Sequence, residues 1–200
     1  MKKNKLIISL LTVFISLSFT KADSPLTSTP ISDAYTDLDI VVKAQKKGKM
    51  TMEFAKFLHD GDNSIDEKAA LINAIGWSID GKANAELYAK YIYSKKLDEL
   101  ELSDLSGDDL FCLGYLQALD DYFNPKKSLP YFEEAEKKLK TSLTVSLIHT
   151  LARAQNIMDN GDWCKIWTMT YQTLNDKSLY RDLREAAIKI IKDYMILYKC

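Results

Sequence analysis

Residues 106–121 read SGDDLFCLGYLQALDD. A serine followed by two aspartates is typical of the start of a helix, because short polar side chains bind the free backbone N–H groups of the first turn. Apolar residues then follow at intervals of three or four, as they do along one face of a helix. This stretch therefore predicts a helix over residues 107–121.

Similar signals mark helices on both sides of this stretch. Ser64 and Glu67 form a capping-box pattern, and Asn124 places a polar cap before Pro125 at the first helical position. No segment alternates apolar and polar residues over more than a few positions, as a half-buried strand would. The sequence predicts an all-α fold of nine helices, near residues 33–47, 50–60, 65–79, 83–96, 107–121, 125–139, 142–158, 162–174 and 179–198.

Alternate helices start near residues 33, 65, 107, 142 and 179, so the successive intervals are 32, 42, 35 and 37 residues. Repeats of about 34 to 45 residues, each made of two helices, are typical of α-solenoids, in which neighbouring repeats share a core. We therefore expect an α-α superhelix (solenoid) of about four helical hairpins with a C-terminal capping helix. This arrangement makes residues 31–200 a single helical-repeat domain.

One part of the chain resembles a known repeat family. Residues 110–117 read LFCLGYLQ, and residues 128–135 read SLPYFEEA. Together they resemble one tetratricopeptide or Sel1-like repeat, in which a Leu-Gly pair lets the second helix pack close to the first. The positions that match this pattern are Leu113, Gly114, Ser128, Phe132 and Ala135, and those that depart from it are Leu110, Gln117 and Pro130.

A weaker match to the same pattern covers residues 72–77 and 85–89, and the other two helix pairs match only in length and period. Proteins of these families are mostly scaffolds that hold peptides or partner proteins on a curved inner surface. The resemblance therefore implies a binding role.

The N-terminus has the pattern of an export signal. Lys2, Lys3 and Lys5 precede an apolar run of 14 residues from Leu6 to Phe19. A membrane-spanning helix needs about 20 apolar residues, so this run is too short to be a stable anchor. It predicts a signal peptide at residues 1–22, cleaved after Ala22. We expect an exported protein, periplasmic or secreted, with a flexible segment at residues 23–30 and no membrane span in the mature chain.

The charge of the exported chain is mildly acidic. The full sequence has 27 basic and 28 acidic residues. The leader holds four lysines and no acid, so 23 basic residues remain against 28 acidic ones, a formal charge of −5. Binding to phosphates needs clustered positive charge, and this composition therefore argues against nucleic acid or an anionic membrane as the main partner.

Three cysteines enter an oxidising compartment, where thiols tend to pair. Cys112 stands in an apolar helix and is typical of a free cysteine packed in a core. Cys164 and Cys200 are then the candidate disulfide. Their unequal distances from the turn between the last two helices count against this pairing.

The candidate partner-binding residues lie on the first helices of two pairs, which usually line the concave face of such a solenoid. Aromatic anchors surrounded by carboxylates suit a basic or hydrophobic partner segment. The alternative for the aromatic residues is packing between repeats. The candidates are Trp77, Asp80, Tyr115, Gln117, Asp120 and Asp121.

Catalytic and metal-binding patterns are missing from the sequence. His59 and His149 stand on different repeats, and neither belongs to a recognisable nucleophile motif. Residues 60–64, DGDNS, begin like a calcium loop, but Ile65 and Leu71 occupy the positions of its glycine and its glutamate. We therefore assign no catalytic residues, no metal site and no cofactor.

Three functions follow from these observations. The sequence favours an exported helical-repeat adaptor that binds another protein without catalysis. An alternative is an immunity-type inhibitor of a secreted toxin enzyme, such as a cell-wall amidase. A third is a cell-envelope hydrolase that uses two carboxylates, because such pairs leave no local pattern in a sequence. The identity of the partner and the oligomeric state are open.

Overall fold

The computed structural model describes residues 24–158 and 161–200. The predicted signal peptide lies outside these residues. Within them the regular elements are helical and only one isolated β-bridge is present, which confirms the all-α prediction. The α-helices are α1 Asp39–Lys47, α2 Met52–His59, α3 Ile65–Ile75, α4 Asn84–Tyr93, α5 Gly107–Asp120, α6 Leu129–Lys138, α7 Leu143–Met158, α8 Trp163–Asn175 and α9 Glu185–Met195.

Short 3-10 helices connect or extend these elements: η1 Ile31–Tyr35, η2 Leu97–Glu99, η3 Leu102–Asp104, η4 Pro125–Ser128 and η5 Ile196–Tyr198. No helix in the described ranges is long and apolar enough to cross a membrane.

Local capping sets several helix starts. The Thr51 hydroxyl accepts a hydrogen bond from the backbone N–H of Phe54 at the start of α2, and the Ser106 hydroxyl accepts one from Asp109 at the start of α5. The predicted capping box at Ser64 does not form, because its hydroxyl donates to the Asp66 carboxylate at 2.5 Å instead. Helix α3 nevertheless begins at the expected residue.

The first expected helix, residues 33–47, is divided in the structure. Its beginning is the 3-10 helix η1, and α1 starts only at Asp39. The segment before it, residues 24–30, packs on the core, with the Leu26 side chain only 1% exposed. The Thr29 hydroxyl donates a hydrogen bond to the Pro25 carbonyl at 2.7 Å within the same segment.

The last helix begins six residues later than the expected position 179. Residues 180–182 instead supply partners for the free backbone N–H groups at the start of α7. The Tyr180 carbonyl accepts from Leu143 N–H at 3.1 Å, and the Asp182 carboxylate accepts from Thr144 N–H at 2.9 Å. These residues therefore cap another helix and cannot form the first turns of their own.

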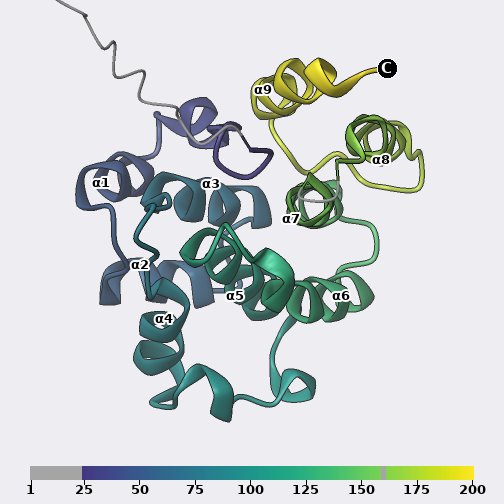
Figure 1. The fold of residues 1–200 in the computed structure, drawn as a ribbon. Helices are drawn as coiled ribbons and strands as arrows, with labels where there is room; N and C mark the ends of the chain where they lie inside the picture. Colours follow the sequence, from purple (N-terminus) through teal and green to yellow (C-terminus); the bar gives the residue numbers. More distant parts are fainter. Residues whose placement is uncertain (1–23, 159–160) are drawn as a thin grey trace, which may run out of the picture.

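Helix α5 lies at the centre of the molecule and contacts α3, α4, α6 and α7 (Figure 1). In the C-terminal half, neighbouring helices pack closely as the pairs α5–α6 and α7–α8. In the N-terminal half, extensive contacts join alternate helices, α1 with α3 and α2 with α4. One continuous cluster of buried apolar residues extends from Leu26 to Met195.

Gly114 allows α5 and α6 to approach closely. A Cβ atom at this position would lie 3.2 Å from the Tyr131 Cβ and 3.3 Å from ring atoms of Phe132. These separations are tighter than ordinary van der Waals contact, so a larger residue has no room unless the helices move apart.

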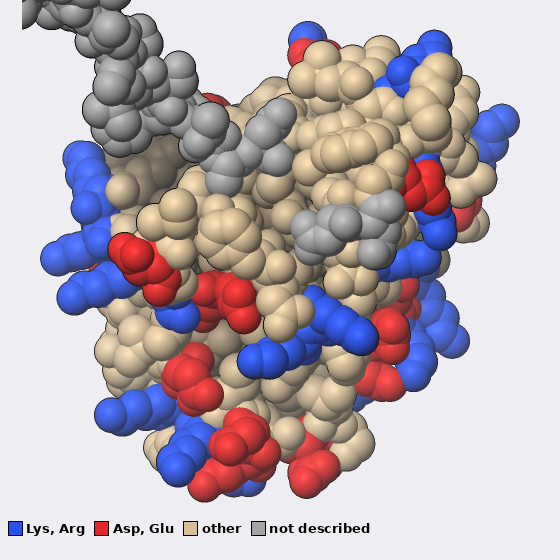
Figure 2. Space-filling model, in the orientation of Figure 1, with Lys and Arg blue, Asp and Glu red and all other residues tan. Residues whose placement is uncertain are grey.

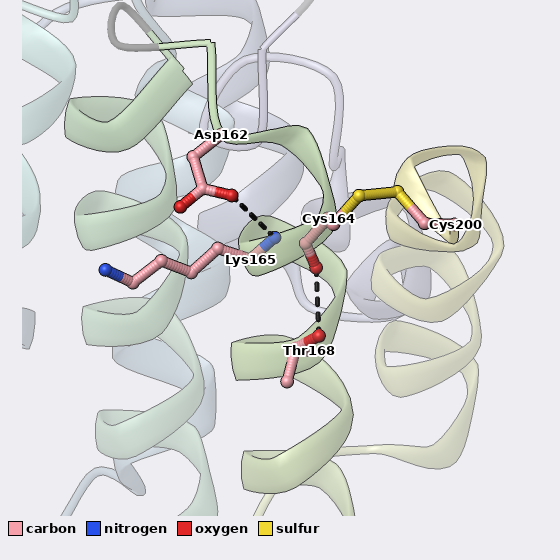
Figure 3. Close-up of a disulfide and its surroundings, with 5 residues drawn as sticks. All are labelled: Asp162, Cys164, Lys165, Thr168 and Cys200. Atoms are coloured by element: carbon pink, nitrogen blue, oxygen red, sulfur yellow. Dashed lines mark hydrogen bonds between the residues drawn. A yellow bond between two sulfur atoms is a disulfide. The ribbon is translucent and has the colours of Figure 1, made fainter.

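Cys164 and Cys200 form a disulfide, with their Cα atoms 5.4 Å apart (Figure 3). The bridge connects the first turn of α8 to the last residue of the chain, which lies beyond the end of α9. Helix α9 begins later than expected, and two residues follow η5. Cys200 therefore lies level with the first turn of α8, which the expected helix lengths did not allow. Cys112 is free and buried.

Candidate partner-binding site

The six candidate residues fall near the C-terminal ends of α3 and α5 and in the loops that follow. Asp80 and Asp121 are exposed, and Trp77 and Gln117 are partly exposed. Tyr115 and Asp120 are buried, at 1% and 8% exposure, and cannot contact a partner in this structure. The predicted set therefore contains both surface and core residues.

Tyr115 is a packing residue, which corrects its assignment to a binding surface. Helices α3, α4, α6 and α7 all contact α5, and the Tyr115 side chain is buried. The Tyr115 hydroxyl accepts a hydrogen bond from the Asn73 side-chain amide at 3.0 Å, so its polar end is also satisfied inside the protein. Of the two roles considered for the aromatic candidates, partner binding and internal packing, Tyr115 has the second.

Asp120 serves the start of α4, which corrects its assignment in the same way. Its carboxylate accepts hydrogen bonds from the Asn84 side-chain amide at 2.9 Å and from the Ala85 backbone N–H at 2.8 Å. Burial raises the pKa of Asp120 to about 6, against the opposing effect of these hydrogen bonds. The side chain thus caps a helix from a distant part of the sequence.

Three aromatic rings, in tilted contact with one another, join the two loops. The Trp77 and Tyr122 ring centroids are 4.6 Å apart, and those of Tyr122 and Phe123 are 4.2 Å apart. Phe123 is 60% exposed, and Ile79 on the neighbouring loop is 68% exposed. We call this surface the loop patch, defined as Trp77, Ile79, Asp80, Asp121 and Phe123. The Tyr122 ring, only 3% exposed, contacts Trp77 and Phe123 and supports the patch from within the fold.

Backbone and side-chain hydrogen bonds hold the two loops together. The Lys82 backbone N–H donates to the Asp120 carbonyl at 2.9 Å. The Lys82 ammonium donates to the carbonyls of Gly48, Ile75 and Gly76 at 2.7, 2.8 and 3.0 Å, which ties the ends of α1 and α3 to the loop. The loop patch is therefore preorganised, which lowers the entropy lost on binding.

Polar groups and a small cavity accompany the apolar side chains of the loop patch. Asp80 and Asp121 form no salt bridge within the part of the chain that the structure describes. The Tyr122 hydroxyl is buried without a hydrogen-bond partner there. A cavity of about 220 Å³ has Trp77, Leu26 and Leu119 in its wall. The patch thus offers apolar contact and negative charge, and one of its members, Trp77, borders this cavity.

Sequence reasoning missed the apolar members of this patch. The sequence predicts Ile79 at the end of a helix, whereas α3 stops at Ile75. Tyr122 and Phe123 follow the end of α5, just before the Asn124–Pro125 turn. The sequence contains one signal that could have identified them: large apolar residues stand in a short segment between a helix end and a proline turn. Loops run over the protein surface, so apolar side chains there are more often exposed than those on the inner face of a helix.

A second group of titratable side chains is structural. The buried Asp109 carboxylate accepts a hydrogen bond from Tyr88 and pairs with His59 Nδ1 at 2.9 Å. The fully buried Lys68 ammonium pairs with Asp108. Because these residues belong to α2, α3, α4 and α5, the group joins four helices. No cluster of three or more potential metal-ligating His, Cys, Asp or Glu residues occurs in the described ranges.

No protein-family model, curated protein or solved structure matches this chain. The resemblance to tetratricopeptide and Sel1-like repeats therefore rests on the residues quoted above. Function is therefore inferred from the chemistry of the loop patch.

Proposed function

We propose that this protein is an exported helical-repeat protein that binds another protein through the loop patch. The observation that carries the proposal is the exposure of Phe123 and Ile79 on two loops that hydrogen bonds fix together. Large exposed aromatic side chains are typical anchors of protein interfaces. Asp80 and Asp121 beside them suit a partner segment that combines apolar and basic side chains.

The packing of the helices supports the repeat part of the proposal. Helices α1, α3, α5 and α7 contact one another in succession, as the first helices of stacked hairpins do in a solenoid. The close approach at Gly114 lies between the two helices that resemble a tetratricopeptide or Sel1-like repeat. On this proposal α9 caps the last hairpin, and the loop patch lies at the ends of two repeats.

Two observations support export. The basic N-terminus and its short apolar run have the pattern of a signal peptide. The Cys164–Cys200 disulfide is typical of proteins in oxidising compartments, because the cytosol keeps most thiols reduced. The proposed location is the periplasm or the medium.

Site-specific photocrosslinking in the native host tests the proposed function. A benzoyl-phenylalanine in place of Phe123 should form a covalent adduct of one discrete mass with the partner after irradiation. The same residue in place of Tyr180, which is 73% exposed and outside the loop patch, is the control. We expect the adduct only at position 123, with a yield that falls severalfold in the Asp80→Lys, Asp121→Lys variant because its repulsion of a basic segment weakens binding.

The partner's identity separates the two binding functions. A toxin enzyme held one-to-one at nanomolar affinity indicates an inhibitor, whereas a partner segment held at micromolar affinity indicates an adaptor. Equal adducts at positions 123 and 180, or none at position 123, would refute binding through the loop patch.

A further inference from the structure

A groove runs between α8 and α9, away from the loop patch in sequence and built from other helices. It has a volume of about 440 Å³, which is within the range of pockets that enclose a ligand of small-molecule size. Helices α8 and α9 lie side by side at one edge of the fold (Figure 1). On the face shown in Figure 2, this edge is mostly uncharged, with charged side chains around it.

Aromatic residues form one wall of the groove. Trp163, Trp167 and Tyr171 are spaced by four and therefore share a face of α8. Trp167 and Tyr171 both line the groove, with ring centroids 5.6 Å apart, and Tyr171 is 53% exposed. Leu174 and Ile188 complete the apolar lining. Exposed aromatic side chains in a groove are typical of a surface that takes an apolar side chain of a partner.

The rim of the groove has an unpaired positive charge. Arg181 pairs with Glu185 at 3.0 Å, and Lys189 pairs with Asp193. Lys192 also lines the groove and forms no salt bridge with any described residue. Residues 162–200 contain seven basic and five acidic residues, whereas the exported chain as a whole is acidic. The groove thus has the opposite charge preference to the loop patch.

The two walls of the groove are joined at one end. The Cys164–Cys200 disulfide links the first turn of α8 to the segment after α9 (Figure 3). Beside it the Trp163 ring stacks on the Tyr198 ring, with centroids 5.7 Å apart. These contacts fix the spacing of the walls before a ligand arrives, and such preorganisation favours binding.

We propose that the groove between α8 and α9 binds a short peptide segment with an apolar side chain next to a carboxylate. The apolar side chain packs against Trp167 and Tyr171, and the carboxylate pairs with Lys192. Charge complementarity selects this occupant over a basic segment, which would meet the unpaired ammonium. The groove and the loop patch together give the protein two binding surfaces of opposite charge preference.

Peptide binding to purified, disulfide-bonded protein tests this proposal. The probes are a fluorescein-labelled octapeptide that alternates Leu with Glu, and its twin that alternates Leu with Lys. Fluorescence anisotropy should show micromolar binding of the acidic peptide, at least about tenfold tighter than that of the basic one. Tyr171→Ser and Lys192→Glu should each weaken binding of the acidic peptide about tenfold.

Two matched substitutions outside the groove serve as controls. Tyr180→Ser removes another highly exposed tyrosine, and Lys165→Glu reverses another exposed charge on α8. Both variants should bind the acidic peptide within about twofold of the parent protein. Equal binding of the two peptides, an unchanged affinity in Tyr171→Ser, or no saturation up to roughly 1 mM peptide would overturn the proposal.

Discussion

Asp109 and Asp120 are both buried carboxylates, yet their surroundings shift their pKa values in opposite directions. Burial raises the pKa of each. For Asp109, hydrogen bonds from His59, Ser106, Tyr88 and Tyr93 outweigh burial and hold the pKa below its usual value. For Asp120, burial prevails and the pKa rises to about 6. The number of side-chain donors around each carboxylate explains the difference.

The raised pKa of Asp120 predicts a specific pH dependence of stability. A carboxyl group whose pKa is higher in the folded state than the unfolded value of 3.8 binds more protons when folded between those two values. Its contribution to stability is therefore present below about pH 4 and is lost as the pH rises through about 6. Asp120→Asn removes this titration and keeps a carbonyl oxygen as an acceptor.

We expect the stability difference between parent and Asp120→Asn to change by about 1–3 kcal/mol from pH 4 to pH 7, in the direction that favours the variant at pH 7. Urea unfolding of both proteins at each pH measures it. A difference that stays constant over this range would show that Asp120 does not titrate there in the folded protein.

Residue-level predictions from sequence succeeded where the cause was local. The Ser106 cap was predictable because its partner is three residues away. The burial of Tyr115 and the capping role of Asp120 were not, because they depend on contacts with α3 and α4, more than thirty positions away. The spacing of residues in a single sequence does not predict which of two such distant residues will be in contact.

At the scale of elements, the helices themselves were largely predictable. Periodicity and caps are local signals, and eight of the nine expected segments contain one α-helix near the expected start. Six of these helices start within two residues of the expected position, and α1 and α6 start after a short 3-10 helix. The ninth failed because residues 180–182 bind the start of α7. When contacts with another helix determine where a helix begins, the sequence of that helix alone does not predict its first residue.

The contact of α5 with α6 predicts the effect of enlarging Gly114. Gly114→Leu should destabilise the protein by about 3 kcal/mol, because the added side chain meets Tyr131 and Phe132 in a packed interface. Gly61→Leu is the matched control, since no atom lies within 4 Å of a Cβ added there. Thermal unfolding followed by circular dichroism measures both. Equal melting temperatures for the two variants would contradict the close approach of these helices.

At the scale of the whole molecule, the two ends of the described fold are joined. Helix α9 contacts η1, and both lie at the same side of the molecule (Figure 1). The Arg184 guanidinium lies 4.1 Å from the centroid of the Tyr35 ring and donates to the Asp37 carboxylate at 2.5 Å. The Tyr35 hydroxyl donates to Asp66 at 2.7 Å, which extends this contact to α3. Helix α9 and the residue before it thus contact the N-terminal segment as well as the neighbouring helix α8.

This junction predicts that Arg184 stabilises the whole fold. Arg184→Ala removes the cation–π contact and the hydrogen bonds to Asp37 and the Ala34 carbonyl, and should lower the free energy of unfolding by about 1–3 kcal/mol. Arg181→Ala is the control, because its exposed pair with Glu185 contributes at most about 1 kcal/mol. Urea unfolding monitored by circular dichroism compares the midpoints. If both variants unfolded at the same midpoint, Arg184 would not couple α9 to the N-terminal segment of the described fold.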